Sequence, residues 1–186
     1  MPADNAAPRD ALPAEMRSRL LENRHGRLAA AQWKELVAEP LVAVLLLTLP
    51  ALFILGPRLL ALFAAGAWLV LGAGAAGLAV MLGLRARRYA RLPLHAATLR
   101  TDAHPRPGWA LWRADVLYTE AGEALRFRRW LAPRLPLRPN RAYLVYYLRE
   151  ESRAVLLSLA PADHPEAASW RPGPAFYDRG ARRARK

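Results

Sequence analysis

A long apolar stretch in the first half of the chain is its clearest pattern. Between Pro40 and Leu84, 45 residues carry one charge, Arg58, which lies at a tight turn. Lipid offers no hydrogen-bond partners to the backbone, so an apolar run of this length is stable in hydrocarbon only as helix. The pattern therefore predicts two transmembrane helices, 40–56 and 59–84, joined as a hairpin.

The arginines that flank this stretch predict its orientation. The predicted hairpin carries only Arg58, whereas a cluster of arginines follows directly after it: Arg85, Arg87, Arg88 and Arg91. Basic residues are retained on the cytoplasmic side of a membrane. We therefore expect a multi-pass protein of the bacterial inner membrane, with both termini in the cytoplasm.

Small residues recur at helical spacing in the second predicted span. Gly72 with Ala76, and Ala73 with Gly77, match the spacing that lets two helix backbones approach closely. The pattern indicates a packing seam, within the hairpin or between protomers, although a composition rich in alanine and glycine also produces it. Neither span carries an ionisable residue, which argues against a transporter or channel.

The region before the apolar stretch has a helical period. Residues 1–11 are rich in proline, alanine and aspartate, which predicts a disordered lead. Residues 12–39 predict an amphipathic helical hairpin, broken at Gly26, a natural left-handed C-cap. A DNA-reading helix-turn-helix is disfavoured, because the six basic residues of this region are balanced by six acidic ones.

The spacing of the apolar residues changes again after the arginine cluster, from a helical pattern to one typical of strands. Five short runs, separated by turn residues, are rich in aromatic and β-branched side chains: 97–101, 109–118, 124–130, 142–149 and 153–160. They predict a small antiparallel β domain over 92–161, either a barrel or a sandwich. Residues 162–186 return to proline, alanine and charge, which predicts a basic disordered tail. The expected fold is thus a membrane α-helical hairpin with a short helical N-terminal segment and a small, mainly-β cytoplasmic domain.

One motif in the last two predicted strands resembles a known group of proteins. Tyr143-Leu-Val-Tyr-Tyr-Leu148 followed by Ser152-Arg153-Ala-Val-Leu-Leu-Ser158 is similar to the end of the β domain in uncharacterised prokaryotic two-span membrane proteins. One extra residue separates Leu148 from Ser152 here. The resemblance implies the same layout of helical segment, membrane hairpin and β domain, and it implies no activity and no functional residues.

Charge is the strongest chemical signal in the sequence. The net charge is +13, and the residues from Arg85 onward hold 21 basic against 9 acidic side chains. Arginines are interleaved with aromatic residues on the predicted strands, with Arg126, Arg128 and Arg129 close to Phe127 and Trp130. Such a surface fits anionic lipid headgroups or single-stranded nucleic acid, and it also fits arginines that serve only topology and solubility. The candidate contact residues are Arg85, Arg87, Arg88, Arg91, Arg126, Arg128 and Arg129.

Catalytic and metal-binding patterns are weak. There is no cysteine, and the four histidines are scattered over predicted loops without helical or carboxylate partners at ligand spacing. Asp102 with His104, and Asp163 with His164, are better explained as surface loop residues than as acid–base pairs. The sequence therefore predicts no metal, no cofactor and no enzymatic activity.

These observations together predict a non-catalytic integral membrane protein. It would act as a scaffold, accessory subunit or regulator that presents a basic cytoplasmic β domain at the membrane surface. Its expected partners are the bilayer with its anionic headgroups and either a membrane protein or a second copy of itself. The alternative is a membrane-tethered nucleic-acid-binding protein, and a membrane enzyme comes third.

Overall fold

The computed structural model describes residues 12–38, 46, 66–102, 115–133, 135–150 and 153–184, and these residues fall into two units. Unit 1 consists of 1–32 and 92–186, and unit 2 of 33–91. Within the described ranges, unit 1 holds α1 (Ala14–Arg24), the five strands, α4 (Ala167–Trp170) and α5 (Pro174–Ala184). Unit 2 holds α3 (Gly66–Arg91), and a further helical segment covers 30–38.

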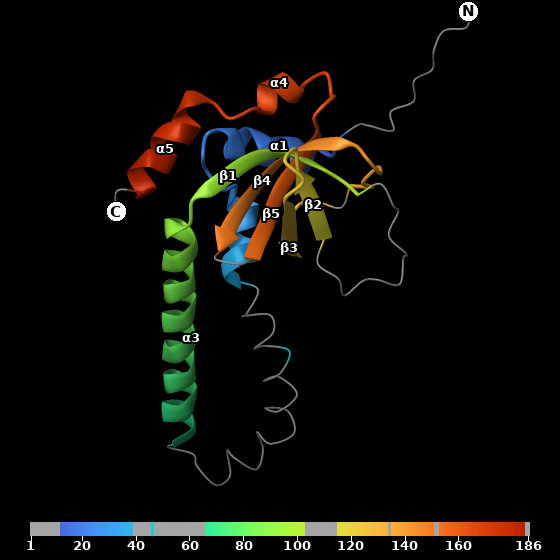
Figure 1. Ribbon diagram of the computed structural model, residues 1–186. Helices are drawn as coiled ribbons and strands as arrows, with labels where there is room; N and C mark the ends of the chain where they lie inside the picture. The colour runs from blue at the N-terminus through green and yellow to red at the C-terminus, as the bar shows by residue number, and fades with distance from the viewer. Residues whose placement is uncertain are drawn as a thin grey trace, which may run out of the picture. The chain divides into compact units, whose positions relative to one another are not determined.

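The five strands of unit 1 form a closed barrel. They are β1 (Leu94–Arg100), β2 (Asp115–Thr119), β3 (Ala124–Trp130), β4 (Ala142–Glu150) and β5 (Arg153–Pro161), in the order β1-β2-β3-β5-β4 (Figure 1). Neighbouring strands pair antiparallel except β3 and β5, which are parallel. The sequence predicted a β domain at this place, and the structure selects the barrel over the sandwich. The prediction that all strands pair antiparallel is wrong, because β5 lies between β3 and β4.

Along β1, β2 and β3, successive side chains point alternately to the inside and to the outside of the barrel. Leu99, Leu117 and Phe127 are at most 2 % exposed and lie on inward-facing positions. Paired residues share one face of a sheet, and their immediate neighbours point to the other. The side chains of β1, β2 and β3 that lie between these inward positions therefore face outward.

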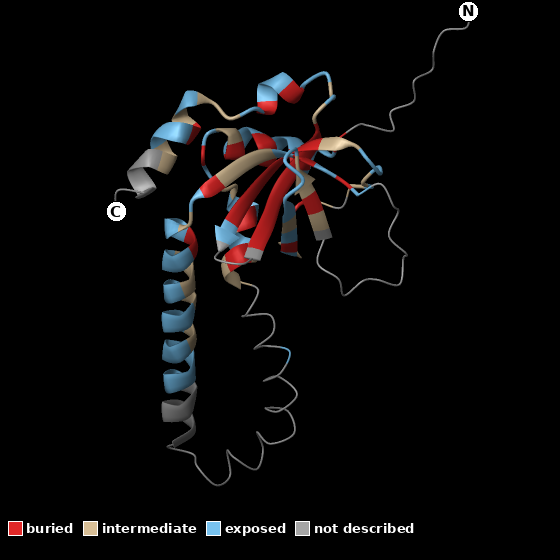
Figure 2. Cartoon of the chain, in the orientation of Figure 1, coloured by how far each residue is buried: buried red, intermediate tan, exposed pale blue. Residues whose placement is uncertain are grey.

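Strands β4 and β5 are buried on both faces, as Figure 2 shows in red. Their outer face is covered by α1, which packs on β5, while α4 and α5 pack on α1. Met16 and Leu20 of α1 are fully buried. This cover explains why β4 reads as a nearly continuous apolar run rather than as an alternating strand.

The C-terminal segment differs from the expected disordered tail, because 167–170 and 174–184 are helical. Trp170 is 2 % and Phe176 9 % exposed. The ring of Phe176 meets that of Tyr146 edge-on, with centroids 5.9 Å apart. Two aromatic side chains thus anchor a segment whose average composition resembles that of a disordered region.

The predicted two-span membrane hairpin is wrong. The first predicted span, 40–56, lies outside the described residues apart from Leu46, as do 59–65 of the second. In the described part of the chain, no helix has both the length and the apolarity needed to cross a bilayer. The last turns of α3 carry Arg85, Arg87, Arg88 and Arg91, and the apolar turns before them are largely alanine and glycine. The inner-membrane localisation and the membrane orientation rested on the hairpin, so they are contradicted as well.

Candidate nucleic-acid interface

The outer face of β1, β2 and β3 presents arginines around one aromatic ring. Arg100 of β1 lies directly opposite Tyr118 of β2, and Arg126 of β3 lies opposite Val116 of β2. Tyr118 and Val116 are two residues apart on the same face, so Arg126 is the diagonal neighbour of Tyr118, at about 7 to 8 Å between backbones. Tyr118 therefore lies between an arginine of β1 and an arginine of β3.

The exposure of these side chains agrees with their position on the outer face of the barrel. Arg100, Arg126 and Arg128 are exposed and Tyr118 is half-buried. Arg126 and Arg128 alternate with Phe127, which fills the inside of the barrel. We call Arg100, Tyr118, Arg126 and Arg128 the basic face.

The structure places the candidate contact residues identified from the sequence in different parts of the molecule. Arg126 and Arg128 belong to the basic face. Arg129 is half-buried beside the irregularity in the β3–β5 pairing, where it lies opposite Val155. The arginines of α3 belong to unit 2, where Arg85 Nε donates a 2.8 Å hydrogen bond to the carbonyl of Leu36 and its guanidinium lies 5.5 Å from the ring centroid of Tyr89. Arg85 therefore has a structural role in its own unit.

The predicted seam on α3 has no partner among the described residues. A Cβ placed on Gly72 or Gly77 would meet nothing within 4 Å. Ala73 and Ala76 are exposed. The seam stays a prediction.

The aromatic residues that the sequence placed near the arginines have different roles. Phe127 is a core residue, so it is not part of the basic face. Trp130 is half-buried at the end of β3, and its Nε1 atom is buried without a hydrogen-bond partner. The other two tryptophans of this region, Trp109 and Trp112, lie outside the described residues.

Two residues of the basic face, Arg100 and Tyr118, were not singled out from the sequence. Both lie in segments predicted as strands, each next to a leucine, Leu99 and Leu117. Had these leucines been assigned to the core, alternation would have placed Arg100 and Tyr118 outside. The missing information was the register that brings them opposite each other.

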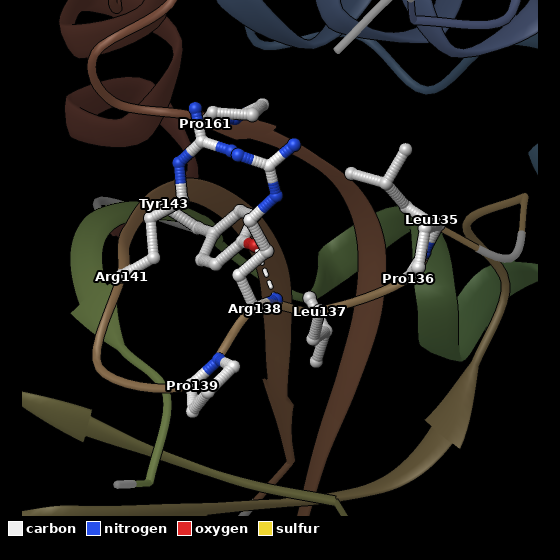
Figure 3. A pocket seen from close by; sticks show the side chains of 8 residues that line it. All are labelled: Leu135, Pro136, Leu137, Arg138, Pro139, Arg141, Tyr143 and Pro161. Carbon is white, nitrogen blue, oxygen red and sulfur yellow. Dashed lines mark hydrogen bonds between the residues drawn. The ribbon is translucent and has the colours of Figure 1, made fainter. Parts of the chain in front are cut away.

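A second feature lies at the end of the barrel where β1 ends. An open cavity of about 320 Å³ is lined by the connection between β3 and β4, the start of β4 and the end of β5 (Figure 3). Arg138 and Arg141 line it together with Tyr143. Arg100 lies opposite Ala142, the residue after Arg141, so the cavity and the basic face meet at this end.

Of the two acid–base pairs weighed from the sequence, only Asp163 with His164 lies wholly within the described residues, and there each side chain has another partner. Asp163 accepts hydrogen bonds from Arg141, and the Nδ1 atom of His164 accepts one from the backbone N–H of Glu166 at 3.1 Å. His104 lies outside the described residues. Among the residues that the structure places, no three His, Asp or Glu side chains gather to hold a metal ion.

Strand order and pairing define the topology of this domain. A closed five-stranded barrel in the order β1-β2-β3-β5-β4, with β3 and β5 parallel, has the topology of the OB fold, whose β2–β3 face binds oligonucleotides or oligosaccharides. Comparisons of the chain with protein-family models, curated proteins and solved structures gave no match. Fold alone does not define function, so the function has to be inferred from the residues on the surface of the barrel.

Proposed function

We propose that the protein binds single-stranded nucleic acid on its basic face. The observation that carries this proposal is the position of Tyr118 between Arg100 and Arg126 on the outer surface of an OB-type barrel. An aromatic ring stacks with any base, and arginines on either side neutralise the phosphates that flank it. This combination favours binding with little sequence preference.

The charge of the chain supports the same ligand. A net charge of +13 raises the local concentration of a polyanion and accelerates its association. The acidic residues Glu120 and Glu123 belong to the β2–β3 turn, which directly follows Thr119, and they set one boundary of the basic face.

Anionic lipid headgroups are the competing ligand, since they offer the same charge. They provide no base to stack on, so a lipid surface would use Arg100, Arg126 and Arg128 but not the ring of Tyr118. The sequence-based interpretation as a non-catalytic scaffold stays a prediction, without the membrane hairpin on which it was built.

Oligonucleotide binding by the full chain tests the proposal. The affinity for a labelled oligothymidylate of about 15 nucleotides, a length that covers one OB domain, would be measured at several salt concentrations between about 50 and 200 mM. We expect log Kd to rise linearly with log salt. Each phosphate contact contributes about 0.7 to that slope for a single strand.

A double variant and a matched control locate the contact. Arg126→Gln with Arg128→Gln should lower the slope by about 1.4, the value for two lost phosphate contacts. Arg27→Gln with Arg171→Gln removes the same charge from exposed positions beside α1 and α4 and should leave the slope unchanged. No salt-dependent binding, equal effects of the two double variants, or binding to phosphatidylglycerol vesicles without binding to the oligonucleotide would overturn the proposal.

A further inference from the structure

The end of the barrel where β1 begins and β4 ends carries a cluster of stacked rings (Figure 1). His95 lies opposite Tyr147, and the two rings stack with their centroids 5.3 Å apart and an interplanar angle of 22°. The ring of Phe127 meets that of Tyr147 edge-on at 5.8 Å. Phe127 and Tyr147 are buried, whereas His95 is half-buried. The imidazole therefore lies at the outer end of the stack, where part of its surface remains accessible.

Two charged side chains act on this cluster. Arg149 is exposed and follows Tyr147 by two residues on β4. Burial, and then the charge of Arg149, lower the pKa of His95. Burial raises the pKa of Tyr147, Arg149 acts against this effect, and Glu123, directly before β3, adds to it. None of the described side chains forms an ion pair with Arg149.

The net charge of this end of the barrel depends on the protonation of His95. With a neutral imidazole, the opposite charges of Arg149 and Glu123 offset each other, and the imidazolium adds one positive charge. An internal phosphodiester of a nucleic acid carries one negative charge, so the protonated cluster matches one phosphate. A phosphate bound beside the imidazole would in turn favour its charged form. Proton uptake and phosphate binding are therefore linked.

A strand on the basic face can reach this cluster across β5. Arg149, Ala154 and Phe127 form a row over β4, β5 and β3. Phe127 itself lies between Arg126 and Arg128, which belong to the basic face. Neighbouring strands are about 4.8 Å apart, so the backbone of Arg149 lies about 10 Å from β3. A nucleic acid that leaves the basic face at β3 thus meets Arg149 next.

We propose that this end of the barrel is a proton-dependent subsite for one nucleotide of the bound strand. The inference rests on the proposed function, because the basic face binds the rest of the strand. The base stacks on the accessible part of the His95 ring, as bases do on histidine and other aromatic side chains. The imidazolium and Arg149 bind the phosphate, while Tyr147 and Phe127 hold the imidazole in place. The strand is bound more tightly as the pH falls.

The test measures strand binding at two pH values. The full chain is titrated at one salt concentration with an oligothymidylate of about 15 nucleotides, carrying hydroxyls at both ends, at about pH 7.5 and about pH 5.5, on either side of the ordinary histidine pKa. We expect about two- to fivefold tighter binding at the lower pH, the contribution of one partly exposed ion pair. His95→Phe keeps a ring on Tyr147 but binds no proton, so it should lose this pH dependence. His25→Phe, at an exposed position after α1, is the control and should retain it.

The imidazole itself gives a second readout. In an NMR titration, the signals of His95 are assigned by their loss in His95→Phe, and the pKa of this group should rise when the oligothymidylate is present. Arg149→Gln should weaken binding at both pH values. An unchanged pKa, undiminished affinity in Arg149→Gln, or a pH dependence that survives in His95→Phe overturns the subsite and leaves salt-dependent binding intact. If no strand binds at either pH, the proposed function fails and the subsite fails with it.

Discussion

The side-chain amide of Asn23 in α1 donates a 2.7 Å hydrogen bond to the hydroxyl of Ser158 in β5. The two residues are 135 positions apart in the sequence, and both are completely buried. This bond joins the N-terminal helix to the last strand of the barrel. It gives the amide nitrogen of Asn23 and the hydroxyl of Ser158 a buried partner, whereas the Oδ1 atom of Asn23 is buried without one.

Loss of either partner should therefore destabilise the fold. Asn23→Ala and Ser158→Ala each leave a buried polar group without its partner, at a cost of about 1 to 3 kcal/mol. The double variant leaves neither side chain, so its loss should be smaller than the sum of the single losses. Urea unfolding of the full chain measures the three values. Strict additivity would show that the bond does not contribute to stability.

Tyr146 joins the barrel to the C-terminal helices. Its hydroxyl is buried and donates a 2.6 Å hydrogen bond to the carbonyl of Trp170, and burial raises the pKa of this phenol far above its ordinary value. Tyr146→Phe should lower the free energy of unfolding by about 1 to 3 kcal/mol, because the carbonyl loses its donor. Hydrogen exchange should quicken in α4 and α5 before it does in the barrel. Tyr177→Phe, at a ring that is 64 % exposed, is the control and should change neither.

Gly26 is expected to resist replacement for two reasons. Its φ is +71°, a left-handed conformation that costs an L-residue about 1 to 2 kcal/mol. A Cβ at this position would also lie 3.3 Å from the backbone Cα of Phe176 in α5. Gly26→Ala should therefore lower the urea midpoint, whereas Ala30→Gly, at an exposed position in the helical segment that follows, should have a smaller effect. Equal loss in both variants would contradict the role of Gly26.

Local patterns and long-range contacts explain which parts of this structure are visible in the sequence. All five strands overlap the predicted segments, because turn residues and aromatic runs are local signals. The parallel pairing of β3 with β5 is not local, since it depends on where the chain after Trp130 returns. The same holds for the cavity, whose residues come from a connection and two strand ends.

The two segments whose structure was predicted wrongly, the apolar stretch and the C-terminal segment, were wrong for a different reason. The length and low charge of the apolar stretch predict membrane spans, but in the described helix α3 small residues and terminal arginines leave no segment apolar enough to cross a bilayer. The C-terminal segment was read by its average composition, which hides the two aromatic residues that anchor it, Trp170 and Phe176. A few large side chains decide whether such a segment folds against the barrel, and averaging removes their signal.

His95 should make stability depend on pH in the weakly acidic range. Burial, and then the charge of Arg149, lower the pKa of this imidazole below its ordinary 6.5, and its ring stacks on Tyr147 at 5.3 Å. Between the two pKa values the unfolded chain binds the proton and the folded chain does not. The free energy of unfolding should therefore fall as pH is lowered from 6.5, the ordinary value, through the folded pKa.

Replacement of the imidazole separates this effect from other titrations. His95→Phe keeps a ring against Tyr147 and cannot bind a proton, so its urea midpoint should fall less than that of the wild type as pH decreases from about 7 to 5, on either side of the ordinary histidine pKa. Parallel pH dependence of the two proteins would show that His95 is not responsible.

Tyr118 distinguishes stacking from charge on the basic face. Tyr118→Ala should weaken binding of an oligothymidylate by about 5- to 150-fold, the equivalent of about 1 to 3 kcal/mol for one stacked base. The salt slope should stay unchanged, since no phosphate contact is lost. Tyr118→Phe keeps the ring and should retain most of the affinity. A reduced slope in Tyr118→Ala, or equal loss in both variants, would show that the ring acts by positioning Arg100 and Arg126 or through its hydroxyl, rather than by stacking on a base.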